Sequence, residues 1–147
     1  MGRKNNNALF FTCSLIEYIG RELKQTRRTV TDFLGIEKIE RIYEYSDVFH
    51  CDPIEKTASE FIEEARIPRG SFDNVAKCKY TVPGFWDIGE VYERLIEDVY
   101  SDEKIVKGIW EVYHSWIDDQ ISDYNTDFYY QSRDYIYECY KEGRVLE

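Results

Sequence analysis

Apolar residues recur at helical spacing along almost the whole chain, and this pattern limits the fold more than any other feature. The clearest example lies between residues 88 and 99, where apolar side chains occur at i, i+3, i+4, i+7, i+8 and i+11. That spacing places them on one face of an α-helix. Alternation of apolar and polar residues, which is typical of a strand, never persists beyond four residues. The sequence therefore predicts an all-α protein.

Capping residues and helix breakers divide this pattern into six to eight helices. Gly35 and Gly143 mark two helix ends, and we expect Asp87 to cap the helix that contains the 88–99 pattern. The expected helices cover about residues 8–24, a short segment capped by Thr29 or Thr31, 36–50, 53–66, 72–78, 87–99, 102–124 and a short stretch before Gly143. A chain of 147 residues fits one domain, so we expect residues 1–147 to form a single helical bundle.

The negative charge is concentrated in the C-terminal part of the chain. Residues 87–142 contain 15 aspartates and glutamates against 5 lysines and arginines, so their net charge equals the formal −10 of the whole protein. The same segment contains 9 of the 13 tyrosines. A charge of this size repels nucleic acids and anionic membranes and attracts basic proteins. We therefore expect a basic protein partner and no direct binding to nucleic acid or to a membrane.

Cysteine use and the N-terminal residues indicate a cytoplasmic protein. The four cysteines are far apart and form no CxxC pair, which is typical of reduced thiols and not of a disulfide framework. Arg3 and Lys4 precede an apolar run at residues 8–16, but no small-x-small cleavage site follows it. No apolar stretch approaches the ~20 residues of a membrane span.

An apolar stripe on the helix expected at 102–124 turns acidic before it ends. Its apolar part consists of Ile105, Ile109, Val112, Tyr113 and Trp116. The same spacing continues to Gln120, Asp123 and Asp127. Either the helix outruns the core or breaks near Asn125, or this point is a polar pocket or a landing site for a cationic partner. The spacing of Asp119, Asp123 and Asp127 matches no EF-hand loop, so we expect no metal and no cofactor.

A second acidic face lies on the helix after Asp87. Glu90, Glu93 and Glu97 share the side opposite to its apolar set, and a solvated face is the ordinary explanation of such a run. The six aromatic side chains between residues 128 and 140 favour more than solubility, because they cannot all be buried on one short helix. Tyrosine is enriched at protein interfaces, since it buries a large rigid area while its hydroxyl stays hydrogen-bonded.

These features favour a non-catalytic protein that binds a basic surface of a partner. Its carboxylates would steer the partner and its tyrosines would anchor it. The residues expected to bind are Glu90, Glu93, Glu97, Asp119, Asp123, Asp127, Tyr129 and Tyr130. A DNA mimic is a sharper version of this hypothesis, in which the carboxylates imitate a phosphate backbone.

Two other classes of protein stay open. The first is an enzyme or a small-molecule-binding domain with a pocket near Asp123, although no GxSxG, P-loop, GxGxxG or HExxH motif occurs. The residues of this alternative pocket are His50, Trp86, Tyr113, Trp116 and Gln120. The second is a structural role as a homo-oligomer, which would require a large apolar patch at a two-fold axis.

Three motifs in residues 9–64 are similar to those of a known family. They are the opening Leu9-Phe10 with Ile16-x-Tyr18, the segment from Ile42-Tyr43 to Asp47-Val48-Phe49-His50, and the closing Glu60-Phe61-Ile62-Glu63-Glu64. In these motifs the chain resembles a family of short helical bacterial proteins of unknown function, often encoded beside ADP-ribosyltransferase-like toxins. The resemblance implies an antitoxin or accessory role. Members often have glycine after the histidine turn, where this chain has Cys51-Asp52-Pro53.

Overall fold

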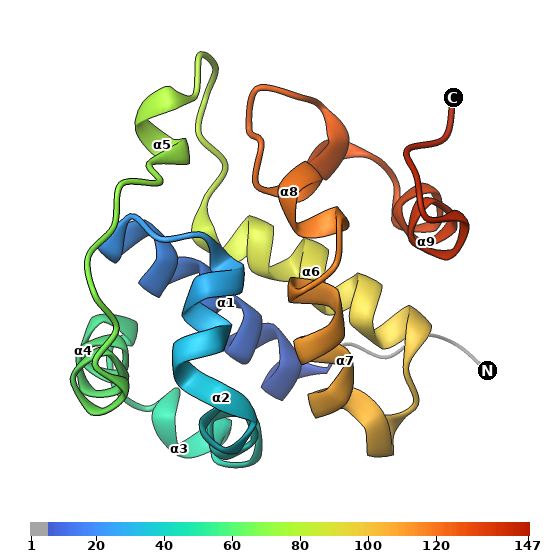
Figure 1. The fold of residues 1–147 in the computed structure, drawn as a ribbon. Coiled ribbons are helices and arrows are strands. Elements are labelled where there is room, and N and C mark those ends of the chain that lie inside the picture. Colours follow the sequence, from blue (N-terminus) through green and yellow to red (C-terminus); the bar gives the residue numbers. More distant parts are fainter. Residues whose placement is uncertain (1–5) are drawn as a thin grey trace.

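Helices make up 70% of the computed structural model of the chain, which describes residues 6–147 (Figure 1). The α-helices in that range are α1 Asn7–Leu23, α2 Arg27–Glu44, α3 Ser46–Phe49, α4 Ile54–Ala65, α5 Asn74–Lys77, α6 Phe85–Val99, α7 Ile105–Tyr113, α8 Ile117–Ile121 and α9 Arg133–Glu142. Two short 3₁₀ helices, Asp102–Lys104 and Phe128–Tyr130, complete the described elements, and none of them is a strand. The all-α prediction is confirmed for this part of the chain, whereas six to eight helices is slightly too few. Arg3 and Lys4 lie outside the described residues.

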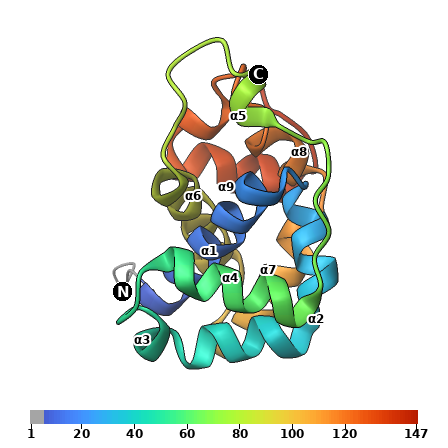
Figure 2. The same cartoon turned by 90° about the vertical axis from the view of Figure 1, so that its left-hand side faces the viewer.

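The first helix, α1, runs through the middle of the molecule (Figures 1 and 2). Asn6 fixes its start by accepting a hydrogen bond from the backbone N–H of Leu9 at 3.0 Å. Every residue from 11 to 17 is buried, because this stretch is apolar or small on all sides except at Glu17. A helix of that kind has to be covered by others, and α6 and α2 make its largest contacts. Glu17 is therefore a charged residue in the core.

The amphipathic helix α6 packs very closely along α1. Its apolar face supplies the buried residues Ile88, Tyr92, Leu95 and Ile96. The backbones approach at Gly89, where an added Cβ would lie 2.8 Å from the Cα of Ser14 on α1. Any residue larger than glycine at position 89 would therefore clash with the backbone of α1.

The long helix expected from the apolar stripe is broken by a turn at residues 114–116. The side chain of Ser115 competes for backbone groups there, because its Oγ donates to the carbonyl of Val112 at 2.7 Å and accepts from the N–H of Ile117 at 3.3 Å. Arg28 of α2 donates to the Ser115 carbonyl at 3.0 Å. The helix thus ends as α7 and restarts as α8, and this break adds to the helix count.

Other helix boundaries also differ from those expected. Thr26 caps α2 in place of the two threonines that the sequence suggested, and its Oγ1 accepts from the N–H of Thr29 at 3.1 Å. The expected helix end at Gly35 is confirmed, because its φ of +74° and ψ of 164° are not helical and divide α2 into two helical parts. Asp87 lies in the first turn of α6 and is not its cap, and its side chain accepts from the N–H of Gly84 at 3.0 Å.

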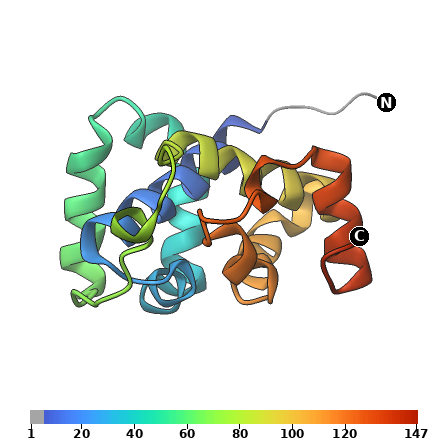
Figure 3. The same ribbon diagram turned by 90° about the horizontal axis from the view of Figure 1, so that it is seen from above.

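The helices share one core, with α4 and α9 at opposite edges of the molecule (Figures 1 and 3). Within residues 6–147, the buried apolar side chains from Leu9 to Cys139 form one cluster. All four cysteines are free thiols. Cys13 and Cys139 are buried, Cys78 is partly buried and Cys51 is exposed. Within residues 6–147, no helix combines the length and the apolar character that crossing a membrane requires.

We expect Gly89→Ala to destabilise the fold by roughly 1–3 kcal/mol, because the added methyl group meets the backbone at Ser14. The usual effect of this change inside a helix is a stabilisation of about 0.5–1 kcal/mol, so the sign should be reversed. Urea unfolding followed by circular dichroism measures the difference. Ser59→Ala on the exposed side of α4 is the control. A variant as stable as the wild type would contradict the close approach of α1 and α6.

Candidate functional site

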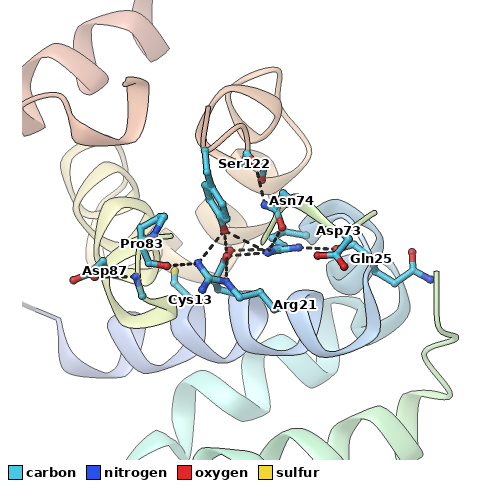
Figure 4. A network of polar contacts seen from close by, with 12 residues as sticks. Cys13, Arg21, Gln25, Asp73, Asn74, Pro83, Asp87 and Ser122 are labelled. Carbon is cyan, nitrogen blue, oxygen red and sulfur yellow. Dashed lines mark hydrogen bonds and ion pairs between the residues drawn. The ribbon is translucent and has the colours of Figure 1, made fainter. Parts of the chain in front are cut away.

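A buried ion pair between α1 and α2 is the centre of a polar network (Figure 4). The side chains of Glu17 and Arg27 are both fully buried. Nε of Arg27 donates to Oε1 of Glu17 at 2.9 Å, and its Nη2 donates to Oε2 at 2.8 Å, so the pairing is bidentate. Gly20 leaves the space for this, since a Cβ there would lie 2.5 Å from Cδ of Arg27.

Arg21 joins this pair to two distant segments (Figure 4). Its Nε donates to Oε2 of Glu17 at 2.8 Å, while its Nη2 donates to the carbonyl of Pro83 at 2.8 Å and to the hydroxyl of Tyr124 at 3.0 Å. The Tyr124 hydroxyl itself donates to Oε2 of Glu17. The Glu17 carboxylate is therefore connected through Arg21 to the segment before α6 and directly through Tyr124 to the loop after α8.

Two asparagines connect α5 to the same loop. Asn74 is buried; its Oδ1 accepts from Nη2 of Arg27 at 3.2 Å and its Nδ2 donates to the carbonyl of Ser122 at 2.9 Å (Figure 4). Nδ2 of Asn125 donates to the carbonyl of Lys77 at 3.0 Å. The loop after α8 is thus hydrogen-bonded on two sides.

Burial and charge oppose each other in this network. Burial alone would raise the pKa of Glu17, but the charges and hydrogen bonds of Arg27 and Arg21 hold that pKa at about 2. Burial would lower the pKa of Arg27, yet the charge of Glu17 raises it. Burial and the same negative charge raise the pKa of Tyr124. Near neutral pH Glu17 and Arg27 are therefore charged and the phenol of Tyr124 is neutral.

A hollow of about 330 Å³, called the acidic cavity below, lies between α5, α8 and the loop after α8. Its carboxylates are Asp118, Asp119 and Asp123, and Tyr124 lines the cavity as well as reaching the ion network. Asp118 is only 2% exposed, and its Oδ1 accepts from the hydroxyl of Tyr92 at 2.6 Å. Burial raises the pKa of Asp118 to about 6, against the effect of that hydrogen bond.

A second hollow of about 410 Å³, called the tyrosine groove below, lies between α6 and residues 129–136. Tyr129 and Tyr130 line one side, and Tyr130 is 80% exposed. Glu90 and Arg94 of α6 line the other side and pair at 3.3 Å. The apolar lining consists of Val82, Pro83, Val91, Leu95 and Ile136. Three residues expected to bind a partner, Glu90, Tyr129 and Tyr130, therefore meet here.

The two hollows share the loop between α8 and α9. The ring of Tyr124, in the acidic cavity, contacts the ring of Tyr129, in the tyrosine groove, edge to face at 5.9 Å between centroids. Tyr129 in turn stacks on Tyr130 at 5.3 Å. A row of three aromatic rings thus leads from the buried ion network to an exposed side chain.

Glu93 and Glu97 do not lie on an exposed face, which corrects the expectation from the sequence. Glu93 is 2% exposed, and Nη2 of Arg133 on α9 donates to Oε1 of Glu97 at 3.0 Å. One oxygen of each of these carboxyl groups is buried without a hydrogen-bond partner. Burial and a hydrogen bond with Glu97 raise the pKa of Glu93 to about 8. Arg133 of α9 reaches Glu97, and the backbone of Asn6 forms a hydrogen bond with Glu93. The local pattern does not reveal these contacts, because both come from segments distant in the sequence.

The three aspartates expected along one helix face lie in different elements. Asp119 is on α8, Asp127 precedes the second 3₁₀ helix, and Asp123 lies in the loop between them. Oδ1 of Asp123 accepts from the N–H of Asn125 at 3.1 Å, which stabilises a turn and not a helix. All three side chains are exposed, and Asp119 and Asp123 meet at the acidic cavity.

The residues of the alternative pocket do not come together. Tyr113 is fully buried in the core. His50 and Trp86 stack on each other at 6.0 Å between ring centroids, next to α1. Trp116 and Gln120 are partly buried at the two ends of α8. The pocket near Asp123 is instead the acidic cavity, with other lining residues.

The sequence interpretation missed Glu17, Arg27 and Tyr124, which are the centre of the network. Glu17 carries one signal, because it is a single charge within a long apolar run. Glu17 and Arg21 are four residues apart, which is also the spacing of ordinary ion pairs on the surface of a helix, so this spacing does not indicate burial. Arg27 has no local signal, since its burial depends on the space above Gly20.

Comparisons with known proteins gave no relative for this chain. No protein-family model matches it, and no curated protein and no solved structure matches it either. The family resemblance of residues 9–64 stays a prediction, and the function has to be inferred from the residues and their geometry.

We expect Glu17→Gln to destabilise the protein at neutral pH by about 3–5 kcal/mol, because Arg27 keeps its charge in the core without a counter-ion. The pKa of Glu17, about 2, lies below its ordinary value of 4.5, so its stabilising effect is complete above pH 4.5 and is lost as the pH falls toward 2. The difference from the wild type should shrink over that range. Urea unfolding at several pH values measures it, with the exposed Glu22→Gln on α1 as control. A difference independent of pH would contradict the ionised pair.

Glu93→Gln should stabilise the protein at alkaline pH. The pKa of Glu93, about 8, lies above its ordinary value of 4.5, so the unfolded chain loses this proton first and wild-type stability falls as the pH rises between the two values. A neutral amide removes that loss, and we expect a gain of roughly 1–3 kcal/mol near pH 8 and little near pH 4. Thermal unfolding across this range is the measurement, and exposed Glu103→Gln is the control. A variant less stable than the wild type at pH 8 would refute a protonated Glu93.

Proposed function

We propose that this protein is a non-catalytic interaction protein that binds a basic segment of another protein in the tyrosine groove. The main support is the pair Tyr129 and Tyr130 beside a hollow of about 410 Å³. Tyr130 is 80% exposed, and Tyr80, directly before the groove residue Thr81, is 69% exposed. Large aromatic side chains that surround a hollow are typical of protein-binding surfaces.

The groove offers the two kinds of contact that a basic segment needs. Its apolar lining accepts apolar side chains, while Asp87 and Glu90 provide carboxylate oxygens. Glu90 pairs with Arg94 through side chains that are both about half exposed. Such a pair contributes little to stability and opens easily. A lysine or arginine of the partner can therefore replace Arg94 at Glu90.

The distribution of charge supports a basic partner. Some carboxylates of residues 87–142 are already used within the protein, because Arg133 engages both Glu97 and Asp98. Other carboxylates of this half are exposed, among them Asp102, Glu103, Asp119, Asp123, Asp127, Glu138 and Glu142. These exposed charges attract a cationic surface at long range and speed its encounter with the groove.

The finer proposal is an antitoxin or accessory protein that covers a basic surface on a toxin. Its support is the resemblance of residues 9–64 to proteins encoded beside toxins. A DNA mimic is the version in which the carboxylates replace phosphates, and DNA would then compete for the same partner. Salt separates the two versions, because a mimic loses affinity steeply with ionic strength and a complex anchored by tyrosines loses less.

Binding of short peptides tests the groove. The probes are fluorescein-labelled nonapeptides in which lysine and arginine alternate with leucine, and matched peptides with glutamate at the charged positions. We expect micromolar binding of the basic peptide by fluorescence anisotropy and none of the acidic one. Tyr130→Ala should weaken the basic peptide about 5- to 30-fold, because it removes an exposed aromatic anchor.

Tyr45→Ala is the matched control for that variant. Tyr45 is a 55% exposed tyrosine at the end of α2 and does not line the groove. Its loss should leave peptide affinity unchanged. Equal binding of basic and acidic peptides, or equal effects of Tyr45→Ala and Tyr130→Ala, would overturn the proposal.

The genes adjacent to the gene of this protein provide a test of the antitoxin proposal. If an adjacent reading frame encodes a protein that stops growth, co-expression of this protein should restore growth, and Tyr130→Ala should reduce the rescue. A harmless neighbouring product would end the antitoxin proposal and leave peptide binding by the groove unaffected.

A further inference from the structure

The acidic cavity has features of a small-ligand site that the proposed function does not use. Its volume of about 330 Å³ lies within the range of small-molecule sites. Asp118 is its buried carboxylate, and the rings of Phe72 and Tyr124 contribute apolar surface. Asp119 and Asp123 add exposed carboxylates.

The carboxyl group of Asp118 is hydrogen-bonded on one side only. Its Oδ1 accepts from the hydroxyl of Tyr92 at 2.6 Å. Among residues 6–147, no donor forms a hydrogen bond with its Oδ2. Asp118 lines the cavity although only 2% of the residue is exposed. Oδ2 is not among the buried side-chain oxygens without a partner in this part of the chain, so it reaches the open space of the cavity, where a cationic donor can bind it.

The fitting cation is organic and not a metal ion. Within the described residues, no three histidine, cysteine, aspartate or glutamate side chains converge closely enough to hold a metal. The apolar surface of Phe72 and Tyr124 suits the methylene groups of an alkyl chain. Lys77 is the one positively charged residue of the lining, against three carboxylates. The charges of Arg27 and Arg28 also act on Asp118, so an added cation is bound mainly between Asp118 and the exposed Asp119 and Asp123.

We propose that the acidic cavity binds one alkylguanidinium or alkylammonium group, with Asp118 as its buried acceptor and Asp119 and Asp123 beside it. The group can belong to a free amine or to an arginine or lysine side chain of a protein, since both present the same head and the same methylene chain. Hydrogen bonds from such a head to a carboxylate are stronger than those between neutral groups. Burial and the charge of Glu17 raise the pKa of Asp118, while the hydrogen bond from Tyr92 and the charges of Arg27 and Arg28 lower it. The resulting pKa is about 6, so the affinity should increase between about pH 5 and pH 7.5.

Calorimetric titration distinguishes a free amine from a side chain of a partner protein as the source of the cationic group. The probes are butylguanidinium, butylammonium, a blocked Gly-Arg-Gly peptide and the uncharged 1-butanol. Millimolar or tighter binding of butylguanidinium or butylammonium supports a free amine as the source, and binding of the peptide alone supports a side chain of a partner. Binding of none of these cations, or binding of 1-butanol as tightly as of butylguanidinium, would overturn the proposal.

Variants of the cavity locate the binding. Asp118→Asn keeps the shape and an oxygen that accepts from Tyr92, and it should weaken the cation at least about tenfold and remove the dependence on pH. The exposed double change Asp119→Asn with Asp123→Asn should weaken it about 3-fold or more. Asp102→Asn, exposed and outside the cavity, is the control.

Two outcomes keep this proposal separate from the function of the groove. Tyr130→Ala should leave binding of butylguanidinium unchanged, because Tyr130 does not line the cavity. If the wild type, Asp118→Asn and the exposed double variant bind the cation equally, and circular dichroism shows all three folded, the cavity is not the site. Peptide binding in the groove would be unaffected by that result.

Discussion

The bidentate pairing of Glu17 with Arg27 is the interaction on which the rest of the structure depends. A glutamate inside a fully buried helix requires a cation with fixed geometry, and Arg27 reaches it because Gly20 leaves the space. Arg21 and Tyr124 then join the same carboxylate, so that two helices and two distant loops meet at one point. Buried ion pairs add little net stability. A packing that separated Glu17 from Arg27 would leave a buried charge without a counter-ion, which costs roughly 3–5 kcal/mol.

The two hollows on the surface follow from this centre. Tyr124 bonds to Glu17, lines the acidic cavity and contacts Tyr129 of the tyrosine groove. The loop between α8 and α9 is therefore positioned by the ion network, and both hollows take their shape from that loop. Asp118 and Tyr92 add a second buried link, between α8 and α6. The surfaces proposed for binding are thus connected to the buried hydrogen-bond network of Glu17, Arg21, Arg27 and Tyr124.

Helical periodicity predicts those elements whose apolar face meets the core, such as α1, α4 and α6. It does not predict the end of α7, because Ser115 redirects backbone hydrogen bonds through its own hydroxyl. Nor does it predict the burial of Glu93 or the pairing of its neighbour Glu97 with Arg133 of α9, 36 positions further along the chain. Of the candidate site, Glu90, Tyr129 and Tyr130 could be chosen from charge and aromatic content alone. Asp118 could not, because its place in the cavity depends on the broken helix.

The sequence by itself determined that this chain is helical and strongly acidic, because spacing and charge are properties of neighbouring residues and of the total. Only the tertiary structure decided which of the 29 acidic side chains are neutralised, which are buried and which are available to a partner. The physical reason is distance along the chain. Helical periodicity in the sequence indicates contacts between residues three or four positions apart. Glu17 and Tyr124, which share the central hydrogen bond, are separated by 107 positions.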